Sequence, residues 1–190
     1  MVVVANNGEL TGSWVALISA VSSAALREDV RLVMSAFYAR VDARIAAQPG
    51  TCWNKGACCR FGEYGHRLYV TALEVAYYLA MGETKAPGVT DVCPHAYEGK
   101  CHVRDRRPLG CRIFFCDPAA QDWQGPLTEE LLAELRGMHD DLGVPYFYAD
   151  WMTVLGHLNG VGRGVESVSE APPRKGNQHI QLRFPDVVQS

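Results

Sequence analysis

The sequence predicts a mainly α-helical domain that wraps around a cysteine-rich metal centre, with long irregular loops and room for one short strand pair. Apolar residues recur at helical spacing in several stretches, whereas residues 83–126 carry few periodic apolar positions, five prolines and four cysteines. A chain of 190 residues is expected to form one domain. We therefore assign residues 1–160 to a single domain, with its metal-binding part at about 50–120, and expect residues 161–190 to be a polar, mobile tail.

Two helices are expected before the first cysteine. Apolar residues repeat at intervals of three and four over residues 14–25, and more strongly over residues 30–45, which is the spacing of one buried helix face. The second helix should end at the sequence Gln48-Pro49-Gly50, because proline cannot continue a helix and glycine favours a turn.

A third helix is expected to begin after Thr71. Thr71 fits the N-cap position and Glu74 completes a capping box, in which each side chain accepts a hydrogen bond from the other residue's backbone. The helix should run to about Met81, where Gly82 can close it in a left-handed conformation. Residues 66–70 are expected to lead into this helix as a short strand.

Two more helices are expected after the cysteine-rich stretch. Thr128 can cap a helix over residues 129–142, and apolar residues between 151 and 158 indicate a shorter one. The sequence His139-Asp140-Asp141 falls in the last turn of the first helix, where two carboxylates oppose the helix dipole. Because this penalty is small, we interpret the sequence as a solvated helix end. Residues 179–184 alternate weakly, as a terminal strand would.

The composition restricts which cellular compartment and which classes of partner are expected for this protein. The net charge is −3, which gives no bias toward nucleic acid or an anionic membrane. No apolar run reaches the ~20 residues that a membrane span requires. The segment before residue 13 has Glu9 and no Lys or Arg, unlike the basic start of a secretory signal. We therefore expect a cytoplasmic protein, in which clustered cysteines are metal ligands or catalytic thiols rather than disulfides.

The cysteines fall into two groups with the expected third helix between them. Soft thiolates select zinc, copper(I) or iron–sulfur clusters, and either a structural zinc or a four-iron cluster takes four of them. Neighbouring side chains such as those of Cys58 and Cys59 diverge, so a cluster or two metals would accommodate this pair better than one ion. The candidate metal ligands are Cys52, Cys58, Cys59, Cys93, Cys101, Cys111 and Cys116.

Basic residues crowd the second cysteine group. Positive charge favours thiolate over thiol and offsets a negative thiolate–metal centre. Arg107 and Arg112 lie on one short loop, where each could donate a hydrogen bond to a sulfur or a carbonyl, or bind an anionic ligand or cofactor. Histidines also lie near the cysteines, and His102 is the best additional ligand candidate among them because it follows Cys101.

The cysteine pattern resembles that of a known family. CWNKGACC at residues 52–59, CPHAYEGKC at 93–101 and RRPLGCRIFFC at 106–116 together resemble the YkgJ-type cysteine-cluster proteins, of the CxxCxxCC type, over about residues 50–120. That family is described as a zinc- or iron-chelating domain and often as containing an iron–sulfur cluster. This chain departs from the family at Lys55, where the family usually has its second cysteine. A related cluster domain occurs in the flagellin lysine methylase.

These observations predict a metal-binding protein that holds an iron–sulfur cluster, with four irons, or alternatively zinc. We expect it to act as a redox or accessory module with a protein partner or electron donor, and without nucleic acid or membrane. Two alternatives stay open: an enzyme that uses the centre for redox or methyl transfer, and a zinc-stabilised structural or interaction domain. Cys52, Cys58, Cys101, Cys111 and Cys116 are the first choices as ligands, and Cys59 and Cys93 follow them. We expect little besides the metal to order residues 83–120.

Overall fold

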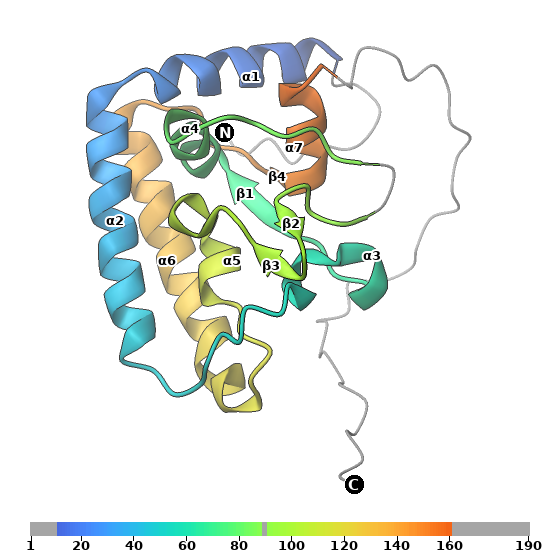
Figure 1. Ribbon diagram of the computed structural model, residues 1–190. Coiled ribbons are helices and arrows are strands. Elements are labelled where there is room, and N and C mark those ends of the chain that lie inside the picture. The colour runs from blue at the N-terminus through green and yellow to red at the C-terminus, as the bar shows by residue number, and fades with distance from the viewer. Residues whose placement is uncertain (1–10, 89–90, 161–190) are drawn as a thin grey trace, which may run out of the picture.

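The computed structural model describes residues 11–88 and 91–160, and the side chains from Trp14 onward. The expected tail at 161–190, with its strand at 179–184, lies outside this range. The described chain is mainly helical, as expected from the sequence, and it contains two small antiparallel strand pairs (Figure 1). No helix in the described ranges is both long enough and apolar enough to cross a membrane.

Helices α1 (Thr11–Ala25) and α2 (Glu28–Ala46) form a corner that encloses the central helix α4 (Ala72–Ala80). Figure 1 shows α1 lying across one end of the molecule and α2 running down one side, with α6 (Gln121–Leu142) beside it. Ion pairs of Arg44 with Glu130, at 2.6 Å, and of Arg40 with Glu134 join α2 to α6. The two helices expected before the first cysteine are therefore confirmed.

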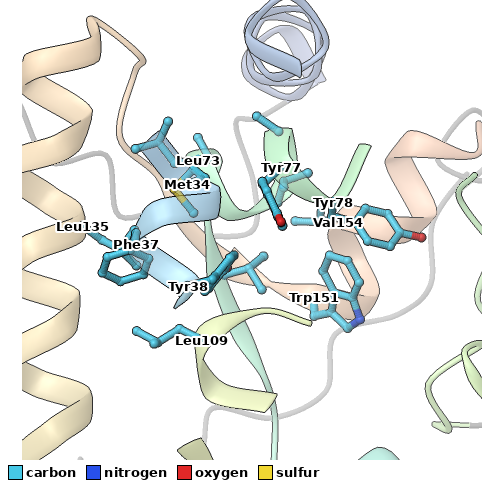
Figure 2. Close-up of a cluster of buried hydrophobic side chains, with 14 of the residues drawn as sticks. Met34, Phe37, Tyr38, Leu73, Tyr77, Tyr78, Leu109, Leu135, Trp151 and Val154 are labelled. Atoms are coloured by element: carbon cyan, nitrogen blue, oxygen red, sulfur yellow. The ribbon is translucent and has the colours of Figure 1, made fainter. Parts of the chain in front are cut away.

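The core forms where these helices meet. Met34, Phe37 and Val41 recur at three- and four-residue spacing on α2, and each is 0% exposed. Figure 2 shows Met34 and Phe37 beside Leu73 of α4 and Leu135 of α6, with Trp151 on the other side of the cluster. Burying side chains of this size is worth roughly 1.5–3 kcal/mol each, which makes this cluster the main source of stability.

The capping box at the start of α4 is confirmed. The backbone N–H of Thr71 donates to Oε2 of Glu74 at 2.7 Å, and the N–H of Glu74 donates to Oγ1 of Thr71 at 3.5 Å. Strand β1 (Tyr69–Thr71) precedes the helix and pairs antiparallel with β4 (Tyr148–Asp150), which leads into α7 (Trp151–Leu158). This pairing brings α7 against α4 and the cysteine-rich stretch.

Helix α6 corrects one expectation. It begins at Gln121, and Thr128 lies inside it rather than at its N-cap. The helix begins early because the 3₁₀ turn η3 (Pro118–Ala120), capped by Asp117, runs directly into it. Thr128 Oγ1 donates to the Gln124 carbonyl at 2.7 Å, which gives this hydroxyl a partner inside the helix.

The cysteine-rich stretch contains short elements where a long loop was expected. Before α4 the chain forms the 3₁₀ turn η1 (Ala57–Cys59) and the single turn α3 (Phe61–Tyr64). After α4 it forms a hairpin of two short strands, a 3₁₀ turn and a short helix, which are β2 (Ala96–Tyr97), β3 (Lys100–Cys101), η2 (Arg104–Arg106) and α5 (Leu109–Ile113).

Candidate metal centre

Four of the seven cysteines come together at one place, and we call them the thiol quartet: Cys58, Cys59, Cys93 and Cys101. Cys59 lies at its centre, because it is the neighbour with the largest effect on the pKa of each of the other three. Cys59 and Cys93 are 4% and 8% exposed and belong to the hydrophobic core. All seven cysteines are free thiols.

Backbone contacts explain how distant segments deliver these thiols. The N–H of Cys93 donates to the carbonyl of Cys59 at 2.8 Å, and the N–H of Ala96 donates to the carbonyl of Cys93 at 2.9 Å. In the hairpin that follows, Ala96 pairs with Cys101. The first cysteine group is therefore attached directly to the base of the hairpin that carries the other two thiols.

Two glycines allow the segments to approach so closely. The hairpin turns at Glu98 and Gly99, which both have positive φ angles, of 52° and 70°, as a tight two-residue turn requires. Gly56, with φ of 67°, packs against this turn, and a Cβ on it would meet the Gly99 backbone at 3.1 Å. A larger residue at position 56 would push the two cysteine segments apart.

The protonation of the quartet follows from its contacts. The hydrogen bond with Cys59 lowers the pKa of Cys58 to about 7 and that of Cys101 to about 6, and it also lowers the pKa of Cys93. These same three hydrogen bonds, with burial added, raise the pKa of Cys59. Cys59 is therefore the thiol of the quartet that ionises last, and its three neighbours ionise more readily.

Trp151 and His95 complete the surroundings of Cys93. After the larger effect of Cys59, the backbone N–H of His95 and the side chain of Trp151, whose only donor is Nε1–H, also lower the pKa of Cys93. The His95 side chain is 1% exposed, and Nε2 lies 2.7 Å from the Tyr78 hydroxyl. The spacing of Trp151 indicated only a core position, so sequence reasoning missed its contact with Cys93.

The remaining cysteines, which we call the outer thiols, are Cys52, Cys111 and Cys116. Burial raises the pKa of Cys111, and the nearby Cys93 and Cys58 raise it further. Burial also raises the pKa of Cys116, followed by the effects of Cys58 and Cys52. These sulfurs are thus near the quartet but have no hydrogen bond to it, although all three were first choices as ligands, ahead of Cys59 and Cys93.

The two predicted arginines contact backbone carbonyls rather than sulfurs. Arg107 donates through Nε to the carbonyl of Arg104 and through Nη1 to that of Cys111, both at 3.1 Å. Its charge lowers the pKa of Cys58 and of Cys101, after the larger effect of Cys59. Arg104, which was not singled out by sequence, lies beside a sulfur, with Nη1 4.0 Å from Sγ of Cys52.

Arg112 serves a structural purpose. It is 3% exposed, and its guanidinium donates to Asp42 on α2 at 2.6 Å, to the carbonyl of Arg107 at 2.9 Å and to that of Asp105. The guanidinium also lies over the Tyr38 ring, 4.0 Å from its centroid. Arg112 therefore fastens the segment that carries Cys111 and Cys116 to α2.

Two other histidines singled out in the sequence, His102 and His139, form hydrogen bonds with backbone groups. His102 donates from Nε2 to the Tyr97 carbonyl at 3.1 Å and stacks on the Tyr97 ring. His139 is 1% exposed, so the expectation of a solvated helix end is wrong for this residue. Its Nδ1 donates to the Val144 carbonyl at 3.0 Å and its Nε2 accepts from the Leu73 N–H at 3.4 Å, which joins the end of α6 to the start of α4.

The chemistry of the quartet suits a soft metal. Sulfurs around one tetrahedral zinc lie ~3.8 Å apart, from a Zn–S distance of about 2.3 Å, and this is a separation at which thiols hydrogen-bond. As the side chains stand, no three His, Cys, Asp or Glu residues within 11–88 and 91–160 surround a position for a metal ion. The quartet side chains would therefore have to rearrange to surround an ion. Metal binding would also displace the proton that the raised pKa of Cys59 favours, since thiols ligate as thiolates.

Comparison with models of protein families, with curated proteins and with solved structures found no match.

Proposed function

We propose that this protein binds a metal through the thiol quartet and works as a redox or accessory module. The observation that carries the proposal is the convergence of Cys58 and Cys59 with Cys93 and Cys101, which the backbone bond from Cys93 to Cys59 and the hairpin hold together. Four buried or half-buried thiols with lowered pKa values on three of them are what a thiolate-ligated centre requires. The resemblance to the YkgJ-type family supports the same proposal.

The surrounding charge supports a negatively charged centre. Four thiolates on one divalent ion leave a net charge of about −2. Arg104 and Arg107 have no carboxylate partner among the described residues, and both lower the pKa of Cys101. The N–H groups of Trp151 and His95 add hydrogen bonds to the sulfur of Cys93, as outer groups around thiolate ligands do. Together these donors would stabilise the ligands in their ionised form.

Two occupants are consistent with the donors, and different observations favour each. The mutual proximity of the quartet thiols favours a single tetrahedral ion, zinc, because one ion is the smallest centre that four thiolates bind. The adjacency of Cys58 and Cys59 and the nearby outer thiols favour an iron–sulfur cluster, which is larger and could reach Cys111 or Cys116. Zinc would supply structural stability or a Lewis acid, and a cluster would supply one-electron chemistry.

The test is metal and acid-labile sulfide analysis of the full chain purified without oxygen, with an absorption spectrum of the same sample. Iron with equal sulfide and visible absorption that bleaches on reduction identifies a cluster, and one equivalent of zinc without iron identifies a single ion. Cys59→Ser should lose most of the metal, and Cys52→Ser is the matched control outside the quartet. Absence of metal in the parent protein, or equal retention in both variants, would refute the proposal.

A further inference from the structure

A cavity of about 320 Å³ opens between the C-terminal end of α2 and the segment that carries the arginines. The apolar part of its lining comes from Ile45 and Ala46 of α2 and from Phe115, which follows α5. Small-molecule sites in proteins start at about 300 Å³ and combine apolar walls with a few polar groups. This cavity therefore has the size and lining for one small organic molecule.

The residues that line the cavity carry more positive than negative charge. The lining includes the guanidiniums of Arg104, Arg107 and Arg112 and the carboxylates of Asp42 and Asp105. Arg112 and Asp42 form an ion pair at 2.6 Å and compensate each other. Two guanidiniums then remain against the single carboxylate of Asp105, which leaves an excess of one positive charge.

The remaining guanidiniums keep hydrogen-bond donors available. Arg104 uses Nη1, toward Asn54 at 3.2 Å and Cys52 at 4.0 Å, while its Nε and Nη2 have no acceptor among the described residues. Arg107 uses Nε and Nη1 for carbonyls, which leaves Nη2. Adjacent Nε and Nη2 donors of an arginine match the two oxygens of a carboxylate or phosphate.

We propose that this cavity binds a small organic anion. Its carboxylate or phosphate oxygens would accept hydrogen bonds from Arg104 and Arg107, and its apolar body would lie against Ile45 and Phe115. The proposal rests on the lining of the cavity and does not require a metal in the quartet. Because Arg104 also lies beside Cys52 and Arg107 lies beside Cys111, a bound anion would be a near neighbour of the cysteine cluster.

Calorimetric titration of the full-length protein tests the proposal with four probes: phenyl phosphate, benzoate, inorganic phosphate and the uncharged benzamide. We expect phenyl phosphate or benzoate to bind more tightly than inorganic phosphate and benzamide, because only these two probes combine an oxyanion with an apolar body. Their order distinguishes a phosphate ligand from a carboxylate ligand. Failure of both to bind, or equal binding of benzamide, would overturn the proposal.

Two variants locate the site. Arg104→Gln should weaken binding of the better aromatic anion by about tenfold or more, since it removes a charge-assisted hydrogen bond. Arg67→Gln is the matched control, because Arg67 is exposed near β1 and pairs with Asp150 outside the cavity. Ala46→Leu fills the cavity without changing charge and should weaken the aromatic anion more than inorganic phosphate. Equal affinity in Arg104→Gln and Arg67→Gln, with both folded by circular dichroism, would refute the site.

Metal content measured on the same samples separates this proposal from the preceding one. Ala46→Leu should retain its metal while it weakens binding of the aromatic anion, and Cys59→Ser should show the opposite pattern. A metal-free parent protein that still binds the anion would refute the metal centre and leave the anion site standing.

Discussion

The two halves of the cysteine-rich stretch are ordered in different ways. The hairpin segment, residues 91–103, is joined to the rest of the chain by backbone bonds from Cys93 to Cys59 and from Gly62 to Asp91, by the contact of His95 with Tyr78 and by the thiol quartet. Most of its other side chains are exposed or half-buried. The arginine segment, residues 104–116, instead inserts Leu109 and Ile113 into the core at 1% and 2% exposure. Figure 2 shows Leu109 in the same cluster as Phe37 and Tyr38.

Charged side chains add to the anchoring of the arginine segment. Arg106 donates to the carbonyls of Tyr78 at 3.2 Å and Glu83 at 2.8 Å, and Arg112 pairs with Asp42. The buried carboxylate of Glu74 accepts from the Leu109 N–H at 2.7 Å. The expectation that little besides a metal orders residues 83–120 is therefore wrong for this segment. The comparison teaches that a metal would stabilise mainly the hairpin segment, which carries two of the quartet thiols and has no buried apolar side chain besides Cys93.

The largest effect is expected from Glu74→Ala. Glu74 accepts from the N–H groups of both Thr71 and Leu109, so its removal leaves two buried donors unpaired, at about 1–3 kcal/mol each. The free energy of unfolding should fall by about 2–6 kcal/mol in urea denaturation. Glu83→Ala, at an exposed carboxylate with no side-chain hydrogen bond among the described residues, should stay within about 0.5 kcal/mol. Similar stabilities in both variants would show that Glu74 does not anchor the arginine segment.

Removal of the metal proposed for the quartet should affect the hairpin segment and the arginine segment differently. Hydrogen exchange followed by mass spectrometry should show amides of the hairpin segment exchanging at least about tenfold faster after chelation, which corresponds to about 1.4 kcal/mol of local stability. Amides of Leu109 to Ile113 should change little, because the core and the guanidiniums still hold them. An equal loss of protection in both segments would remove the distinction between them.

A smaller effect is expected from Trp151→Phe. This change keeps an aromatic ring near Tyr78 but removes the N–H that donates to the Cys93 sulfur. Loss of such an outer hydrogen bond typically weakens metal affinity by about 10- to 100-fold, which competition with a coloured chelator measures. Trp123→Phe is the matched control, because its N–H donates to the Pro49 carbonyl at 2.9 Å. If both variants bind metal equally well, the contact with Cys93 has no bearing on the centre.

The smallest effect is expected from His139→Gln, and it concerns the loss of stability at acidic pH. Burial lowers the pKa of His139 in the folded protein, so the unfolded chain takes up the proton first as pH falls. Stability should therefore decrease below about pH 6.5, the ordinary histidine pKa, and rise again with pH. Denaturation midpoints between pH 7 and 5 should show a shallower slope in His139→Gln. His95 and His157, whose pKa values burial also lowers, keep part of the slope. An unchanged slope would contradict the buried, neutral state of His139.

Local features were predictable because neighbouring residues determine them. The capping box of Thr71 and Glu74 and the apolar face of α2 depend on spacings of three and four residues, which the sequence displays directly. The start of α6 was not predictable, because Thr128 fits an N-cap locally. The actual start follows from the turn capped by Asp117, whose carboxylate also accepts from the Thr51 N–H at 2.9 Å.

By itself, the sequence determined that thiols and guanidiniums are concentrated in one stretch and that helices enclose them. Only the tertiary structure decided which thiols meet, with Cys59 at the centre, and that Trp151 donates to Cys93. It also decided that Arg112 reaches α2 rather than a sulfur. The reason is physical: these meetings depend on backbone contacts between distant segments, such as Gly56 against Gly99, and side-chain periodicity carries no information about such contacts.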